Sequence, residues 1–254
     1  SFSSGRTVGQ FPNCTKPRSL YAMLNQPYAM TRIFSTATLL LFINISFGQT
    51  KIDLKEIERL TKDSTSEYFY SRLISEFNNH PKLFDSAKAK FIYYGRLYTN
   101  SYKMLQFTAD DKQFNNLLSK GKYKKAIPFG EKILQDIPAN IEIISKLHLC
   151  YNKSDLKEEA DTALTKLTIL LNTVLESGTG QNPNDAFKVV AIGDEYSIMA
   201  LLGLAGITRQ TLMKGASTID SWKVKEIKSG KKSELHFEWL VNAEQGIKNM
   251  KWPD

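Results

Sequence analysis

The sequence predicts a mainly helical α+β fold, in which tetratricopeptide-like helix pairs are followed by a small antiparallel β-sheet. Helical spacing of apolar residues dominates up to about residue 176. Within it, Ala126 and Ala160 are 34 residues apart, which is the period of a tetratricopeptide helix pair. Beyond residue 177, alternating and β-branched segments replace this pattern, as in Phe187–Ala191.

The first 48 residues are expected to be missing from the mature protein. Residues 1–29 are rich in Ser, Gly, Pro and Asn, and we interpret them as disordered upstream read-through before a true start at Met30. Residues 30–48 have the order of a signal peptide: Arg32, an apolar run, and small residues before cleavage near Gly48–Gln49. The run is too short to span a bilayer well. We therefore expect export to the periplasm or the extracellular space, with no membrane span.

Residues 49–176 are predicted to form the helical domain. Asp53-x-x-Glu56 and Ser64-x-x-Glu67 have the spacing of helix-capping boxes. A helix that starts at the second box is expected to end before Pro81, and another is expected over 86–98. The repeat then supplies four helices, marked by Phe114–Leu118, Tyr123–Ile137, Ile144–Tyr151, and the run from Ala160 to Val174 with Asp155 as its cap.

Residues 177–254 are predicted to be a strand-rich part packed on the helices. Ser177-Gly-Thr-Gly180 stops the last helix, since glycines can adopt the positive φ that a helix end often needs. Trp222–Glu226 and Leu235–Trp239 are expected to form a β-hairpin, and 207–213 is a further candidate strand. Residues 194–204 are ambiguous between strand and helix, with strand slightly favoured.

Charge and chemistry exclude several functional classes. The formal charge is +8, but residues 1–48 contain four basic residues and no acid, so the remaining chain has 30 basic and 26 acidic residues, or +4. These charges are interleaved, as on a solvated surface, so we expect no nucleic-acid partner. Neither His/Cys metal motifs nor a phosphate-binding loop is present, so no metal and no cofactor is expected. Cys150 is expected to be a buried thiol.

An ordered series of motifs resembles a family of exported proteins of Bacteroidetes-type bacteria catalogued as domain of unknown function 4919. The resemblance covers roughly Ile52 to Val241 and implies export and this architecture, without an activity. The chain differs from the family at Thr179, where an acid is usual, and at Glu238, where aspartate is usual, so no acidic site is carried over at those positions. The matching segments are Tyr68–Leu73, Tyr93–Gly95, Tyr123–Ala126, Ser177–Gly180, Ala186–Val189, Asp194–Tyr196, Gln210–Leu212, Asp220 and His236–Glu238.

One polar constellation is a candidate binding site: Ser177, Gly178, Gly180, Asp194, Glu195 and Tyr196. The acids are expected near the Ser177–Gly180 loop, where they either accept hydrogen bonds from its backbone amides or face a ligand. The absence of a catalytic motif favours a non-catalytic module that binds a protein or peptide in the helical groove. The alternative is a hydrolase-type enzyme with an acidic site between repeat and sheet. The sequence leaves the oligomeric state open.

Overall fold

Helices occupy most of residues 52–201 in the structure, a computed structural model that describes residues 52–102, 108–214 and 217–240. The expected read-through and signal peptide therefore lie outside the described residues. The first group is α3 (Leu54–Lys62), α4 (Tyr70–Asn79) and α5 (Ser86–Gly95), with the 3-10 turns η1 (Pro81–Leu83) and η2 (Arg96–Tyr98). The second group is α6 (Ala109–Ser119), α7 (Tyr123–Asp136), α8 (Ile141–Lys153) and α9 (Lys157–Leu175).

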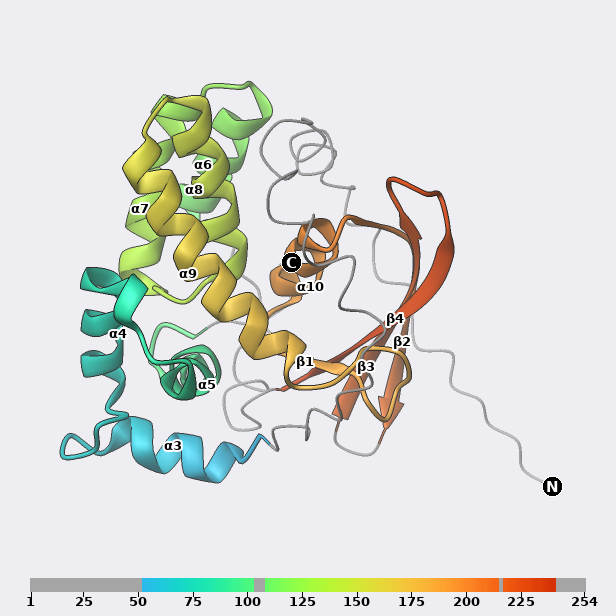
Figure 1. Cartoon of the computed structure of the whole chain (residues 1–254), viewed down its shortest axis with the longest axis horizontal. Coiled ribbons are helices and arrows are strands. Elements are labelled where there is room, and N and C mark those ends of the chain that lie inside the picture. The colour runs from blue at the N-terminus through green and yellow to red at the C-terminus, as the bar shows by residue number, and fades with distance from the viewer. Residues whose placement is uncertain (1–51, 103–107, 215–216, 241–254) are drawn as a thin grey trace.

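The four helices α6 to α9 pack in sequence order, each against the next (Figure 1). Ala126 in α7 and Ala160 in α9 are 0% and 1% exposed, and Cys150 in α8 is also buried. Gly130 allows another close contact, since a Cβ there would lie 2.8 Å from Phe114 and Leu147. The predicted helices are present, while their assignment to the tetratricopeptide type stays a prediction.

The three predicted helix caps have different outcomes. Asp53 caps α3 as expected, because its carboxylate accepts hydrogen bonds from two backbone amides. The Ser64 box is wrong: α4 begins at Tyr70, and the Ser66 hydroxyl instead accepts a bond from the Tyr68 amide in a local turn. Asp155 is not the cap of α9 either, since it lies in the left-handed region at φ 58° and α9 starts two residues later.

The sheet contains β1 (Phe187–Val189), β2 (Leu204–Lys214), β3 (Ser217–Glu226) and β4 (Lys232–Trp239), in the order β1-β4-β3-β2. The predicted hairpin is confirmed as β3 and β4, with Trp222 opposite Leu235. The sheet is mixed rather than antiparallel, because β1 pairs parallel to β4. A parallel pair needs a long crossover, and α10, β2 and β3 supply it.

The slight preference for a strand at 194–204 is wrong. This region forms α10 (Ile192–Leu201), and β2 begins only at Leu204. Asp194, Glu195, Ser197, Ile198, Met199 and Leu201 are all buried. A helix buried on most sides carries no polar face, so its sequence lacks the 3.6-residue period that identifies amphipathic helices.

Helical and strand-rich parts share one hydrophobic core. Val174 of α9, Val189 of β1 and Phe237 of β4 are fully buried in the same cluster. In Figure 1, α9 runs from the helical part to the start of β1, and α10 lies between the helices and the sheet. None of the described helices is both long and apolar enough to cross a membrane.

Enlarging Ala126 or Ala160 to leucine should lower the free energy of unfolding by about 1–3 kcal/mol, because each side chain sits at a fully packed helix contact. Urea unfolding followed by circular dichroism measures this. The matched control is Ala87→Leu at an exposed position of α5, which should change stability little. If wild type, the two alanine variants and the control all had the same urea midpoint, the packing described for α7 and α9 would be contradicted.

Candidate functional site

The Ser177–Gly180 loop ends α9 and leads toward β1. The Ser177 hydroxyl donates to the Val174 carbonyl at 2.6 Å and accepts from the Lys188 amide at 2.8 Å. A Cβ on Gly178 would lie 2.5 Å from the Ala186 carbonyl oxygen, and Gly180 has φ +67°. The two glycines are therefore required by the backbone path, as the sequence predicts for a helix stop.

Two amides of the loop donate to one nearby backbone carbonyl. Both Thr179 and Gly180 donate to the Asp185 carbonyl, at 3.1 and 2.8 Å. The Gly180 carbonyl in turn accepts from the His236 amide of β4 at 2.9 Å, which ties the loop to the sheet. The hypothesis that Asp194 or Glu195 accepts these amides is wrong, because both carboxyl groups have other partners.

Asp194 faces the helices from the first turn of α10. Its Oδ2 accepts a hydrogen bond from the Tyr93 hydroxyl at 2.8 Å and lies 3.3 Å from Nη1 of Arg96. The Arg96 guanidinium also donates to the Ala139 carbonyl at 2.9 Å. Both charged side chains are almost completely buried. Burial raises the pKa of Asp194, whereas Arg96 and Tyr93 act to lower it.

Glu195 faces the sheet from the same helical turn. Its two carboxyl oxygens accept hydrogen bonds from the indole N–H groups of Trp222, at 2.8 Å, and Trp239. Its carboxyl also hydrogen-bonds Asp220 of β3, which is likewise fully buried. Burial, reinforced by the negative charge of Asp220, raises the pKa of Glu195 well above its ordinary value. The raised pKa favours the protonated form of Glu195, which can donate a hydrogen bond to the Asp220 carboxylate.

Tyr196 completes the predicted constellation on the sheet side. Its ring packs edge-on against Trp222, with centroids 5.2 Å apart, and its side chain is half-buried. Successive residues of an α-helix point about 100° apart. Asp194 can therefore contact the helices while Glu195, the next residue, contacts the sheet. The structure thus separates the six predicted residues into a loop and two buried networks. Asp194 and Glu195 line neither of the two hollows described below, and their contacts join the helices to the sheet.

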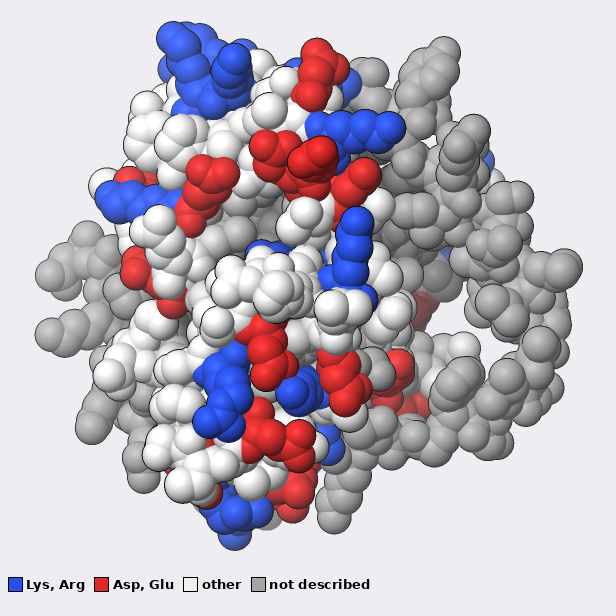
Figure 2. Space-filling model, turned by 60° about the vertical axis from the view of Figure 1, so that its left-hand side comes forward, with Lys and Arg blue, Asp and Glu red and all other residues white. Residues whose placement is uncertain are grey.

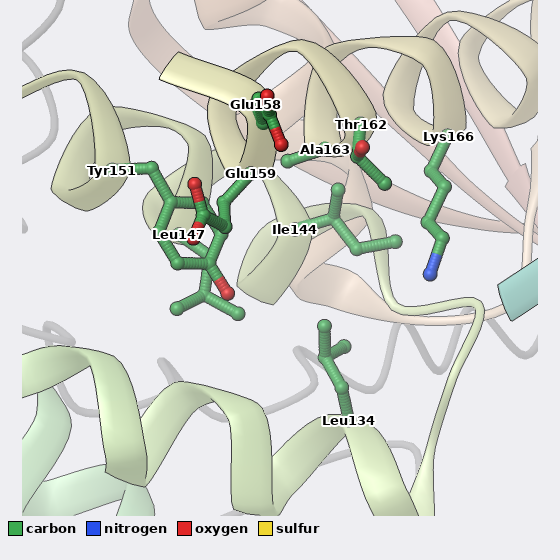
Figure 3. A pocket seen from close by; sticks show the side chains of 9 residues that line it. All are labelled: Leu134, Ile144, Leu147, Tyr151, Glu158, Glu159, Thr162, Ala163 and Lys166. Carbon is green, nitrogen blue, oxygen red and sulfur yellow. The ribbon is translucent and has the colours of Figure 1, made fainter. Parts of the chain in front are cut away.

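A groove on the helical part is the candidate binding site. It has a volume of about 340 Å³ and lies between α7, α8 and α9 (Figure 3). Its floor is apolar, and Figure 3 shows Glu158, Glu159 and Tyr151 at one end and Lys166 at the other. The complete lining is Leu134, Ile144, Leu147, Tyr151, Glu158, Glu159, Thr162, Ala163 and Lys166.

The charges of the groove lack oppositely charged partners. Lys166 donates to the side-chain oxygen of Asn78 at 2.8 Å and lies 5.3 Å from the centre of the Phe77 ring. Burial lowers its pKa, and within 52–102, 108–214 and 217–240 it forms no ion pair. Glu158 and Glu159 form none within those ranges either. Over this side of the molecule, acidic and basic side chains are otherwise interleaved (Figure 2).

A second pocket lies on the sheet, with a volume of about 390 Å³. Ser221 of β3 and His236 of β4 are directly opposite in the ladder, and the hydroxyl lies 2.8 Å from Nδ1 of the imidazole. The carboxylate of Glu234 is 3.9 Å from the other ring nitrogen. Burial lowers the pKa of His236, so the ring is neutral at pH 7. His236 is nearly buried, at 4% exposed.

The sequence predicted a groove on the helical part but not the residues that line it, and it did not predict the pocket on the sheet. Ser221 and His236 meet only through the β3–β4 register, which an alternating pattern does not fix. The groove depends on how far α7 stands from α9, and no single residue signals that distance. The one feature of the sequence that could have indicated the groove was a lysine, Lys166, among apolar residues of the predicted helix. In the part of the chain that the structure describes, no three His, Cys, Asp or Glu side chains are grouped to hold a metal ion.

Comparison with known proteins identifies the family. A family model described as "Domain of unknown function (DUF4919)" matches residues 55–238. The chain belongs to this family. The match starts inside α3 and ends in β4, so it covers both the helical part and the sheet. No curated protein and no solved structure matches the chain. The resemblance inferred from the sequence motifs is confirmed at the level of the family.

Replacing Glu195 by glutamine tests the protonated carboxyl. Because the folded-state pKa of Glu195 is raised, its proton contributes stability below about pH 4.5, and this contribution is lost as pH rises through the folded-state pKa. The carbonyl oxygen of a glutamine side chain can still accept a hydrogen bond, and its NH₂ group can donate one to Asp220 at every pH. We expect Glu195→Gln to flatten the decline in stability above pH 4.5 and to be more stable than wild type above neutral pH, by roughly 1–3 kcal/mol.

The measurement is a series of urea titrations across pH, with Glu56→Gln at an exposed position of α3 as the matched control. The control should follow the wild-type pH profile. A Glu195→Gln protein that is destabilised at every pH would instead mean that Glu195 is ionised in the folded state.

Proposed function

We propose that the protein is a non-catalytic binding module that holds an extended peptide segment of a partner protein in the groove between α7, α8 and α9. The observation that carries the proposal is the combination of a hollow apolar floor with charges of opposite sign at its two ends, which form no ion pair within the described ranges. Its volume of about 340 Å³ is at the lower end of the range typical of ligand pockets.

The polarity of the groove defines the chemistry of the segment. An apolar side chain fits over Ile144, Leu147 and Ala163, which are buried at the floor. A basic side chain fits beside Glu158 and Glu159. A carboxylate fits beside Lys166, where it would offset the burial that lowers the pKa of the lysine. The preferred segment therefore carries a basic residue, then apolar residues, then a free C-terminal carboxylate.

A binding assay with defined peptides tests this function. Short fluorescent peptides with arginine first, leucines in the middle and a free C-terminal carboxylate should bind, as measured by fluorescence anisotropy. Identical peptides with an amidated C terminus should bind about fivefold more weakly, equivalent to roughly 1 kcal/mol. Binding that is absent, or equal for both peptides, would overturn the proposal.

Two variants locate the binding in the groove. Lys166→Met keeps the side-chain stem over Phe77 and removes the charge, so it should abolish the difference between carboxylate and amide peptides. Lys157→Met is the matched control on the same helix, because that lysine is exposed and outside the groove. Unchanged discrimination by Lys166→Met would place binding elsewhere.

A hydrolase is a second candidate, favoured by the Ser221–His236 pair in the sheet pocket. A hydroxyl in hydrogen-bond contact with a neutral imidazole has the arrangement of an activated nucleophile. His236 would take the proton as Ser221 attacks the carbonyl carbon of an ester, and would pass it to the alcohol that leaves as the ester C–O bond breaks. Water would then hydrolyse the acyl-serine, which releases the carboxylic acid and restores the Ser221 hydroxyl. The acids Asp194 and Glu195, proposed from the sequence for such an enzyme, are not in this pocket.

A serine-directed fluorophosphonate tests the second candidate. The hydrolase predicts covalent labelling of wild type that is lost in Ser221→Ala and retained in Ser233→Ala, an exposed serine of β4. Mass spectrometry identifies the labelled residue. Wild type that stays unlabelled while the peptide assay is positive would leave the binding module as the function.

A further inference from the structure

The ammonium group of Lys166 is held between α9 and α4. It donates a hydrogen bond to Oδ1 of Asn78 at 2.8 Å and lies 5.3 Å from the centre of the Phe77 ring. Both partners belong to α4, in which Phe77 is buried and Asn78 is exposed. Figure 3 shows the Lys166 side chain reaching away from the ribbon of α9, at the opposite end of the groove from the acids. The positive charge at this end is therefore positioned before a ligand binds.

Asn78 supplies a second hydrogen-bond donor beside this charge. An ammonium group can only donate, so the oxygen of the Asn78 amide must be the atom that faces it. The NH₂ group, bonded to the same carbon atom, then lies next to the ammonium. Within 52–102, 108–214 and 217–240, this NH₂ group donates to no acceptor. A carboxylate has one negative charge and two acceptor oxygens, which matches a charged donor and a neutral donor side by side.

The opposite end of the groove receives acids from two helices. Glu131 of α7 accepts a hydrogen bond from the Tyr151 hydroxyl at 2.8 Å, and Glu158 and Glu159 of α9 line the same end (Figure 3). Burial raises the pKa of Tyr151, and the nearby negative charges of Glu131 and Glu159 raise it further. None of the three acids forms an ion pair in the described part of the chain. A guanidinium, with five donors, can bind several of these oxygens together.

The distance between the two ends is set by α9, because both ends include residues of this helix. Lys166 follows Glu158 and Glu159 by eight and seven residues, which is about 10–12 Å along the axis at about 1.5 Å per residue. An extended peptide advances about 3.3 Å per residue, so three steps cover about 10 Å. A segment with its carboxylate at Lys166 therefore reaches the acidic end with the residue three positions before its last.

We propose that Lys166 and Asn78 together bind the terminal carboxylate of the partner segment, and that the groove selects a four-residue C-terminal tail whose first residue is basic. The inference rests on the proposed peptide-binding function and extends it. Helix α4 becomes part of the binding site through Asn78. The partners are proteins that end in a basic residue followed by three apolar residues.

The position of α4 favours the end of a chain over an acidic side chain within one. Phe77 and Asn78 lie directly against the Lys166 ammonium, so α4 stands at this end of the groove. In Figure 1, α4 lies below α7 along the same side of α9. A segment that continued past Lys166 would meet α4, whereas a chain that ends there places both carboxylate oxygens against the two donors.

Isomeric peptides test the spacing. Fluorescent hexapeptides of one arginine and five leucines, all with a free C-terminal carboxylate, have the same charge and composition but differ in the place of the arginine. Fluorescence anisotropy should show the tightest binding with three leucines after the arginine, by about fivefold over one or five leucines. Affinities that do not depend on the place of the arginine, or that peak elsewhere, overturn the four-residue spacing.

Two variants of equal charge test the role of Asn78. Asn78→Asp keeps an acceptor for Lys166 but replaces the NH₂ donor by a negatively charged oxygen. It should abolish the roughly fivefold preference for a carboxylate peptide over its amide. Asn79→Asp is the matched control, because it adds the same charge at the neighbouring exposed residue of α4 and leaves the partner of Lys166 in place. It should keep the preference. Thermal unfolding checks that both variants remain folded.

These outcomes separate the inference from the function on which it rests. Wild type that binds neither peptide, or binds carboxylate and amide peptides equally, overturns the peptide-binding function and this inference together. If wild type prefers the carboxylate while Asn78→Asp and Asn79→Asp prefer it alike, the function stands and the role of Asn78 is overturned.

Discussion

The burial of two adjacent carboxyl groups at the start of α10 is the constraint on which the rest of the structure depends. Asp194 is held by Tyr93 and Arg96, and Glu195 by two tryptophan N–H groups and Asp220. Removing one partner of such a network leaves a buried polar group without compensation, which costs more than the network contributes as a whole. Helices and sheet are therefore fixed relative to each other by polar contacts inside a shared apolar core.

This constraint explains why the candidate site lies away from the most conspicuous polar residues. Carboxyl groups that are needed to join two parts of a fold cannot also face a ligand. The groove between α7, α8 and α9 has the opposite character. Glu158 and Glu159 are exposed, Lys166 is half-buried, and none of the three has an ionic partner among the described residues. In this protein, exposure and missing partners indicate a binding site better than the number of polar residues does.

The sequence was sufficient for the class of fold, the four helices α6 to α9 and the β3–β4 hairpin, because each has a regular local period. It failed at α10, where burial on most sides removed that period, and at β1, whose parallel pairing depends on residues about 50 positions away. The loop glycines were predicted correctly from local backbone needs. The partners of Asp194 and Glu195 were not, since Arg96 and Trp239 are far from them in sequence.

The position of β4 inside the sheet has a consequence for the order of assembly. β4 is the last strand in sequence, yet it lies between β1 and β3. During synthesis, β1 therefore has no strand beside it until the chain has been made as far as Trp239. Helices α6 to α9 contact their sequence neighbours and can form much earlier, because local contacts close quickly. Chains halted before β4 would carry a formed helical part with β1 unpaired and open to aggregation.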